Sequence, residues 1–568
     1  MSEKKKCIEC GERFVVEDRD LSFYKKISPT FNGIVFNMPL PQLCPKCRLQ
    51  RRWAVRNQSK LYKRKCDFSG KEMVSLYAPD SKHVVYSEDI WWSDKWDPMK
   101  YGKEYNNKKS VFDQFRELQL QIPRRGMQQD GTNENCEYTT FGMNNKNCYL
   151  AFACFGSEDI YYSSWSVMSR DIVDCLLAFN SELLYECIHC DKCYKSIHCK
   201  NCNGCSECYF MEDCSNCQNC IGCKNITNKQ YYIYNQPSTK KEYERLRAKL
   251  QREGFESEKE KYDKWKLLQP NRYAHIIASE NCDGDYIYNS KNCHNCFGIF
   301  TSGAESCQYC HMCGSQAKDM ADCAMSGYSS ELLYEMQATS GAYKSAFVSF
   351  CRFSKHVYYC DSISSCEHCF GCIGLNNKKY CIFNKQYTKD EYEKKVAEIV
   401  KNMEKEGEWG EYFPIQNSPF PYNNTLAQDY FPLSKKEIID REYQYKADDR
   451  FKPTKPVTVL DKDIEKVGEE ILEAVLSCKS CGKNYKIIPQ EYRLYKILKV
   501  SIPRKCPDCR HTTRMSQIKA LKLHHRQCMC EEPGHGHEGR CKNEFETTYA
   551  PDRPEKVYCE ECYQKSVL

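Results

Sequence analysis

Residues 135–162 read NCEYTTFGMNNKNCYLAFACFGSEDIYY, and this stretch repeats itself every twelve residues. The repeated segments lie at 135–138, 147–150 and 159–162, and each is an Asn or Asp followed by a short run rich in Cys, Tyr or Ile. Asn and Asp favour tight corners because their side chains bond to the neighbouring backbone. The period therefore predicts a mostly β, multidomain protein built from the coils of a β-solenoid.

The repeat region is itself duplicated. The sequence SELLYE at 181–186 returns at 330–335, and the offset of 149 residues persists as far as Tyr243 and Tyr392. We therefore expect two tandem β-solenoid-like lobes.

Each lobe is followed by the same helix signal. A Thr is followed three residues later by Glu at 239–242 and again at 388–391, which is a capping box. We expect charged capping helices at 240–268 and 389–406, because an uncovered strand edge at the end of a solenoid invites aggregation. The other expected elements are an extended strap at 409–455 and one helix at 461–476.

The two ends of the chain are copies of one cysteine-rich module. CIECG at 7–11 recurs as CKSCG at 478–482, and CPKCR at 44–48 recurs as CPDCR at 506–510. Two CxxC pairs separated by a loop can place four thiolates around one tetrahedral Zn²⁺. The predicted zinc-ribbon ligands are Cys7, Cys10, Cys44 and Cys47 in the first copy, and Cys478, Cys481, Cys506 and Cys509 in the second.

A second metal site is expected only in the C-terminal copy. YAPD at 77–80 matches YAPD at 549–552, which places Ser87 and Ile90 where the second copy has Cys559 and Cys562. Neither residue can replace a thiolate, so the N-terminal site is degenerate. We expect the C-terminal ion to be held by Cys541, Cys559 and Cys562 with either Cys528 or Cys530, while His535 and His537 are solvated loop residues. The chain should then bind about three Zn²⁺ ions.

The duplication also separates packing cysteines from possible ligands. Five cysteines of the first lobe align with Met, Val, Ser or Ile in the second, which favours a role as small buried hydrophobes: Cys187, Cys199, Cys205, Cys208 and Cys214. The run Cys217-x2-Cys220-x2-Cys223 is kept as Cys366-x2-Cys369-x2-Cys372. Core packing is the default for these two runs, and ligation of zinc or an iron–sulfur cluster stays open.

A basic segment follows the second knuckle of each ribbon. Residues 46–65 hold nine Lys and Arg, no Asp or Glu, and the aromatic residues Trp53 and Tyr62. Basic helices with an aromatic for base stacking are typical of phosphate-binding surfaces, so we expect weak binding of RNA or single-stranded DNA. The residues expected at this interface are Arg48, Arg51, Arg52, Trp53, Arg56, Lys63, Arg64, Arg510, Arg514, Lys519, Lys522 and Arg526. The alternatives are a protein-interaction scaffold that uses the Tyr-rich lobes and an iron–sulfur or redox protein that uses the CxxCxxC runs.

The composition favours a soluble, reducing context and no enzyme. The 568 residues include 42 cysteines, and no apolar leader or bilayer-length stretch accompanies them, so we expect a cytoplasmic protein without a membrane partner. The chain has no Walker lysine loop and no HExxH motif. GHGHEG at 534–539 matches GxGxxG by letter, but it lies between metal cysteines and does not join a strand to a helix.

Several motifs together carry a family resemblance. With SPFPYN at 418–423, AQDYFP at 427–432, YAPDRP at 549–554 and the CPxCR knuckles, the chain resembles a group of uncharacterised bacterial zinc-ribbon proteins with a Cys- and Tyr-rich repeat core. The resemblance implies zinc at both ends and no established activity. The expected organisation is an N-terminal zinc module (1–97), a linker (98–130), lobe 1 (131–237), a capping helix (238–271), lobe 2 (272–387), a helix, strap and connecting helix (388–477), and a C-terminal double zinc module (478–568).

Overall fold

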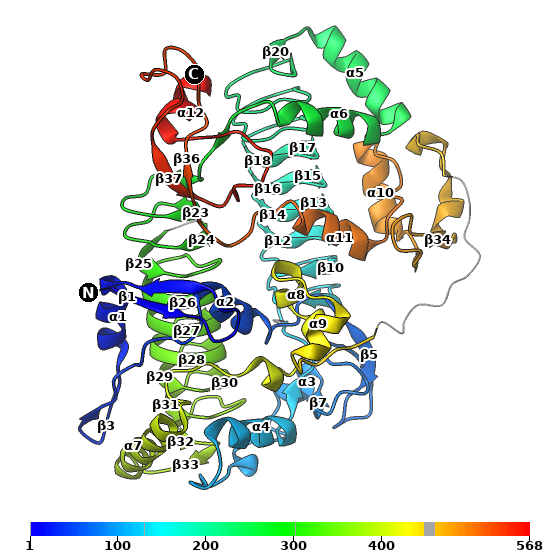
Figure 1. Ribbon diagram of the computed structural model, residues 1–568. Helices are drawn as coiled ribbons and strands as arrows, with labels where there is room; N and C mark the ends of the chain where they lie inside the picture. The colour runs from blue at the N-terminus through cyan, green and yellow to red at the C-terminus, as the bar shows by residue number, and fades with distance from the viewer. Residues whose placement is uncertain (1, 130, 301–302, 448–459, 568) are drawn as a thin grey trace.

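The computed structural model of the chain describes residues 2–129, 131–300, 303–447 and 460–567 (Figure 1). Within these ranges the protein is mostly β, with many sheets and twelve α-helices. Two columns of short strands stand side by side, and cysteine-rich modules from both ends of the chain lie against them (Figure 1). The mostly β class expected from the sequence is therefore observed.

The first column consists of short parallel strands paired at the predicted twelve-residue period. Arg170 of β13 lies opposite Glu182 of β15, and Ile172 lies opposite Leu184. The strands are β9 (Tyr138–Thr140), β10 (Tyr149–Phe152), β11 (Glu158–Tyr161), β12 (Ser164–Val167), β13 (Arg170–Val173), β14 (Leu176–Phe179), β15 (Glu182–Tyr185), β16 (Ile188–Asp191), β17 (Tyr194–Ile197) and β18 (Lys200–Asn203).

Each coil of the first column has four corners. Left-handed backbone recurs at every third residue, as at Asp159, Tyr162, Trp165 and Met168, before the pattern restarts twelve residues on at Asp171. Each three-residue side turns one side chain into the column, and these inward positions are filled by cysteines and aliphatic residues. The CxxC spacing inside the lobes is therefore the spacing of the coil sides.

Buried thiols line the interior of the column without forming disulfides. All 42 cysteines of the chain are free. The Cys208 thiol, for example, donates to the carbonyl of Ser206 at 3.3 Å and to that of Cys217 in the next coil at 3.5 Å. Both carbonyls also accept a backbone N–H, from Asn219 and from Ser206, so the thiol adds a second hydrogen bond to each oxygen. The predicted packing role of Cys187, Cys199, Cys205, Cys208 and Cys214 agrees with their burial in this core.

The second column repeats the arrangement with longer strands at its centre. Its parallel strands are β22 (Ile276–Ile277), β23 (Gly284–Tyr288), β24 (Cys296–Ile299), β25 (Ala304–Gln308), β26 (Ala317–Gly327), β27 (Glu331–Ser340), β28 (Tyr343–Arg352), β29 (Lys355–Tyr358), β30 (Asp361–Ser364), β31 (Glu367–Phe370) and β32 (Lys379–Ile382). The short hairpin strands β19 (Tyr232–Ile233) with β20 (Gln236–Pro237), and β33 (Lys385–Gln386) against β32, close the two columns.

Helices cover the end of each column, with one difference from expectation. α7 (Lys389–Glu406) spans the predicted range, but the first cap divides into α5 (Lys240–Glu253) and α6 (Glu256–Lys266). The break lies at Gly254, whose φ of 85° is outside the helical region. Both predicted capping boxes are present, at Thr239 and at Thr388.

The strap and the connecting helix also differ from expectation. The described part of 409–455 is folded into short helices rather than extended, and residues 448–455 lie outside the described residues. These helices are η2 (Ile415–Asn417), η3 (Tyr422–Asn424), α8 (Leu426–Tyr430) and α9 (Lys435–Asp440). The predicted helix at 461–476 is two single turns, η4 (Ile464–Lys466) and η5 (Glu469–Leu472), because Gly468 lies between them.

The terminal modules pair short hairpins with helices. The N-terminal module and the linker contain β1 (Glu3–Lys6), β2 (Arg13–Val16), α1 (Asp18–Ile27), β3 (Thr30–Phe31), β4 (Ile34–Val35), α2 (Pro45–Trp53), β5 (Tyr62–Lys65), β6 (Glu72–Ser75), β7 (Val85–Tyr86), α3 (Glu88–Trp91), η1 (Pro98–Tyr101), α4 (Val111–Gln121) and β8 (Arg124–Arg125). The C-terminal module contains β34 (Leu476–Ser477), β35 (Asn484–Tyr485), α10 (Pro489–Leu498), α11 (Pro507–Met515), β36 (His524–Gln527), β37 (Glu544–Thr547), β38 (Val557–Tyr558) and α12 (Glu560–Val567). β38 pairs with β21 (Asn271–Arg272) where the first column passes into the second.

Candidate metal centres and the groove between the columns

The two predicted CxxC quartets are brought together. In each quartet the four sulfur atoms all lie within 4.8 Å of one another. Cys10 and Cys44 are 3.7 Å apart at Sγ, as are Cys481 and Cys506. A tetrahedral ion with Zn–S bonds of about 2.3 Å would separate its sulfurs by about 3.8 Å, whereas a disulfide would need about 2 Å. The geometry therefore fits a bound metal ion.

Local structure favours the thiolate form of one member of the first quartet, Cys44. Cys44 caps the N-terminus of α2, with Pro45 in the first turn, and Cys47 lies one turn along. The hydrogen bond from Cys47 lowers the pKa of Cys44 to about 5. A metal ligand must be a thiolate, and a helix N-terminus favours that form.

The N-terminal module has one thiol, Cys66, in the region that matches the second C-terminal site. This thiol accepts the backbone N–H of Ser87 at 3.3 Å and contacts the Ser87 hydroxyl at 3.5 Å. Burial raises the pKa of Cys66, but hydrogen bonds from Ser69 and Ser87 outweigh it and bring the pKa to about 7. Among the described residues no group of metal donors includes Cys66.

The C-terminal module contains two further donor groups where the sequence predicted one. Cys528, Cys541, Cys559 and Cys562 form the first group. Cys530, His535, His537 and Cys562 form the second. The first group contains Cys528, one of the two expected alternatives, and the second adds Cys530. The two histidines were expected to be solvated, but they belong to this second group. The loop at 534–539 folds back and places each imidazole beside a sulfur.

The CxxCxxC runs of the lobes lie in the column cores. Cys217 donates to the carbonyls of Ser215 and Ile226 at 3.3 and 3.4 Å, and Cys366 makes the equivalent pair of contacts. Within the described ranges, no donor group contains a member of either run. Core packing, the default expectation, is the role that this placement supports.

The basic helix of the N-terminal module is buried, in disagreement with the expected nucleic-acid surface. Arg48, Arg51, Arg52, Trp53 and Arg56 are between 0% and 7% exposed. The helix α2 lies against β26 and β27 of the second column (Figure 1). These side chains therefore do not form an exposed basic face.

Carboxylates of the second column neutralise this helix. Arg48 Nε lies 2.9 Å from Asp322, and Arg52 bonds to Asp322 and to Glu335 at 3.2 and 2.7 Å. Arg51 bonds to Glu335 at 2.9 Å. Burial alone would raise the pKa of Glu335, but the adjacent arginines hold it below its usual value, so the carboxylate stays ionised.

Trp53, which was expected to stack on a base, contacts other side chains of the protein instead. Trp53 Nε1 lies 3.2 Å from His311 Nδ1, and its ring stacks on Tyr430 at a centroid distance of 5.8 Å. It belongs to the contact between α2, the second column and α8. A nucleic-acid base cannot reach it.

The C-terminal module docks on the first column through the matching residues. Arg514 donates to Asp174 at 2.8 Å, and Arg510 Nε donates to the same carboxylate at 3.1 Å. Arg510 lies over the Tyr162 ring at 4.8 Å, as Arg48 lies over Tyr309 at 5.1 Å. Each ribbon is thus fixed to a lobe by the same set of contacts, the N-terminal ribbon to lobe 2 and the C-terminal ribbon to lobe 1.

The other predicted interface residues are dispersed. Lys519 is buried against Asp285 at 3.0 Å, and Lys522 pairs with Glu12 at 3.1 Å. Arg64 bonds to Asp67, and Arg526 bonds to backbone carbonyls of 549–550. Lys63 is exposed on β5. The twelve residues do not form two basic faces.

A groove that the sequence analysis missed runs between the columns. It encloses about 680 Å³, and the described residues of its lining include ten aromatic residues, three arginines and no Asp or Glu. Facing aromatic residues come from both columns, as in Phe141 against Phe350 and Phe179 against Phe300, each pair with centroids 5.7 Å apart. The only signal in the sequence was the set of aromatic residues at outward coil positions, and nothing local shows that these positions face each other.

Arg56 supplies a cation to this groove. Its guanidinium lies 3.5 Å from the Phe141 ring centroid and donates to Gln58, and among the described residues it has no carboxylate partner. Burial lowers the pKa of Arg56 to about 9, so the side chain is still charged at neutral pH. A buried cation without a counter-charge favours an anionic group of a ligand.

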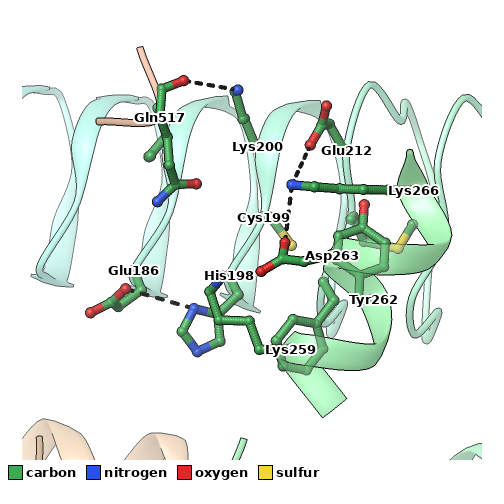
Figure 2. A pocket seen from close by; sticks show the side chains of 13 residues that line it. Glu186, His198, Cys199, Lys200, Glu212, Lys259, Tyr262, Asp263, Lys266 and Gln517 are labelled. Carbon is green, nitrogen blue, oxygen red and sulfur yellow. Dashed lines mark hydrogen bonds and ion pairs between the residues drawn. The ribbon is translucent and has the colours of Figure 1, made fainter. Parts of the chain in front are cut away.

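A second, smaller pocket lies where polar contacts connect the first column to its capping helix. Figure 2 shows it between the first column, α6 and the segment at Gln517. Its volume of about 20 Å³ holds little more than one water molecule. Lys266 bridges Glu212 and Asp263 at 3.2 Å each, and Lys200 donates to the Gln517 carbonyl at 3.1 Å (Figure 2). These ion pairs tie the capping helix to the column and leave no room for a substrate.

Comparison with known proteins adds no family. No protein-family model and no curated protein sequence matches the chain. A solved structure from Desulfovibrio desulfuricans G20, named an acetyltransferase, is similar over 44% of this chain and 67% of its own, at 7% identity and a TM-score of 0.10. A likeness at this level carries no argument. Over the described ranges, none of the helices combines the length and the apolar character that crossing a membrane requires. Of what the resemblance to zinc-ribbon proteins implies, the structure supports cysteine groups that could hold metal ions at both ends of the chain.

Proposed function

We propose that this protein is a non-enzymatic, zinc-stabilised scaffold of two β-solenoid lobes, and that the groove between the lobes binds an extended apolar segment of a partner protein. The observation that carries the proposal is the aromatic groove with the buried cation of Arg56 in its wall, where the described lining residues include no carboxylate. Each donor group offers four ligands, which closes a tetrahedral Zn²⁺ to water and favours a structural metal over a catalytic one. The free thiols suit a reducing, cytoplasmic environment.

The chemistry of the lining favours a polypeptide as the occupant. Aromatic rings and methionines such as Met143 and Met312 adapt to apolar side chains of different shapes. One carboxylate of the partner would face Arg56 and compensate its buried charge. The occupant is therefore an extended segment with large apolar side chains and one acidic residue.

A single-stranded nucleic acid fits this groove less well. It carries one phosphate per nucleotide and needs cations along its path. Of the other two lining arginines, Arg125 already binds Glu88 at 2.8 Å, and Arg352 has an interaction within the protein. Nucleic-acid binding stays the second candidate, and the same experiment tests it.

The test is fluorescence anisotropy with two labelled twelve-residue peptides of alternating Phe, Leu and Ser, one with a central Asp and one with Asn. Phe353 lies in the groove wall and is 61% exposed, so Phe353→Ala should not disturb folding. Phe68→Ala is the matched control, because Phe68 is 46% exposed and lies outside the groove. We expect Phe353→Ala to weaken binding about tenfold, as hot-spot aromatics do, and Phe68→Ala to leave it unchanged.

Arg56→Gln should remove the preference for the Asp peptide over the Asn peptide. Equal effects of the two Phe variants, or no binding of either peptide, would refute the groove as a peptide site. Binding of a uridine oligonucleotide that Phe353→Ala abolishes, without peptide binding, would establish the nucleic-acid function instead.

A further inference from the structure

The two donor groups of the C-terminal module share one residue, Cys562. We propose that they form a single two-zinc centre in which the Cys562 thiolate bridges both ions. The first ion would be bound by Cys528, Cys541, Cys559 and Cys562, and the second by Cys530, His535, His537 and Cys562. The inference rests on the proposed zinc occupancy of the donor groups and goes beyond it, since it predicts four ions per chain and a shared ligand.

The spacing of the second group matches a tetrahedral ion. Cys530 Sγ lies 3.2 Å from His535 Nδ1, and Cys562 Sγ lies 3.4 Å from His537 Nε2. Zn–S and Zn–N bonds of about 2.3 and 2.0 Å at a tetrahedral angle would place sulfur and nitrogen about 3.5 Å apart. Each contact is therefore close to one edge of a coordination tetrahedron.

The far nitrogen of each imidazole faces an oxygen, within hydrogen-bond distance for His537 and slightly beyond it for His535. His537 Nδ1 lies 2.8 Å from the carbonyl of Gly539, which fixes Nε2 as the free lone pair. His535 Nε2 lies 3.6 Å from the carboxylate of Glu532, which leaves Nδ1 for the metal. A carbonyl or carboxylate behind the ring orients the ligand and raises its basicity.

The backbone of the loop is built for this placement. Gly534 and Gly536 flank His535 with φ angles of 83° and 87°, a conformation that residues with a side chain rarely adopt. Lys565 of α12 donates to the His535 carbonyl at 2.7 Å and holds the loop against the helix that carries Cys562. The sequence GHGHEG is thus explained as a metal-binding loop.

Charge balance also favours two ions. Five thiolates and two neutral imidazoles around two Zn²⁺ carry a net charge of about −1, whereas four thiolates around one ion carry about −2. Cys530 is fully buried, so with a single ion its sulfur would coordinate no metal in the protein interior. The second ion joins the loop to α12, a connection that the N-terminal module cannot make.

Metal content of the full-length protein separates the one-ion and two-ion centres. After dialysis against buffer with trace Zn²⁺, elemental analysis should give four ions per chain. The double variant His535→Ala/His537→Ala should give three, with unchanged circular dichroism. His525→Ala is the matched control, because His525 lies in the same module, pairs with Glu544 and Glu546, and belongs to no donor group. It should retain four ions.

The bridge is tested by loading the protein with ¹¹³Cd²⁺ alone. Two of the resonances should show ¹¹³Cd–¹¹³Cd coupling through the shared sulfur, and the coupling should vanish in the double histidine variant. Three ions in the wild type, or four in the double variant, would overturn the two-ion centre. Four ions without coupling would overturn the bridge. Absence of metal from the CxxC quartets as well would instead refute the proposed zinc scaffold.

Discussion

Replacing Asp174 by Asn tests whether buried ion pairs fix the C-terminal cysteine-rich module to the first column. The Asp174 side chain is fully buried and accepts hydrogen bonds from Arg510 and Arg514, which are each 2% exposed. Asn has almost the same shape, but it leaves two guanidinium groups facing a neutral amide in the protein interior. The change therefore removes charge compensation without creating a cavity.

The expected loss of stability follows from the burial of the ion pairs between Asp174 and the two arginines. Removing one partner of a buried ion pair costs about 3–5 kcal/mol. Glu491 lies 3.7 Å from Arg510, and Glu186 also interacts with both arginines, so part of the compensation remains. We expect a loss of about 3 kcal/mol, a large share of the 5–15 kcal/mol that stabilises a typical domain.

Hydrogen exchange of α11 is the assay, because it reports the local free energy of opening. Glu182→Gln is the matched control on the same lobe, since Glu182 pairs with Arg170 at the surface and such pairs contribute less than about 1 kcal/mol. Faster exchange of α11 in Asp174→Asn, but not in Glu182→Gln, would show that the ion pairs of Asp174 hold this helix on the column. If the two variants protect α11 equally, the C-terminal module is not held by these charges.

Three other outcomes are expected. Cys208→Val should leave the metal content unchanged and cost no more than about 1.5 kcal/mol in urea unfolding, because the thiol packs in the lobe core; loss of an ion would contradict that role. His275 lies 3.0 Å from both Asp213 and Asp285; burial alone would lower its pKa, but the two carboxylates raise it above its usual value. Its stabilising contribution should be complete below about pH 6.5 and disappear as the pH rises through the folded pKa, so the difference in melting temperature between the wild type and His275→Gln should shrink over that range. Cys10→Ser should remove one ion by elemental analysis while the C-terminal ions stay bound.

Sequence repeats and cysteine spacing predicted much of the strand arrangement and the grouping of the terminal cysteines. The twelve-residue period at 135–162 predicted the parallel pairing of the first column, and the SELLYE duplication predicted the second. Parallel registers offset by twelve residues occur in both columns, and such a register keeps sequence neighbours close in space. The CxxC quartets were also correctly grouped, since tetrahedral ligation restricts the spacing of cysteines in a knuckle.

The same CxxC spacing occurs in the lobes for another reason. In the sequence, metal-binding pairs could be distinguished from packing pairs only by comparing the two copies of the repeat region. Inside a column the spacing reflects three-residue sides, and the aligned residues of the other lobe are often apolar. The histidines at 535 and 537 were misjudged, because a loop of glycines gives no periodic signal for where its side chains will lie.

The sequence by itself determined the coils, the doubled lobes and the cysteine quartets, because these depend on contacts between residues that are close in the chain or obey a fixed ligand spacing. Only the tertiary structure decided whether the basic helices are buried or exposed, and whether a groove forms between the columns. Arg52 and Asp322 are 270 positions apart, and Arg514 and Asp174 are 340 apart. A run of arginines therefore has the same composition whether it faces solvent or a buried carboxylate, and its exposure depends on partners that no local pattern contains.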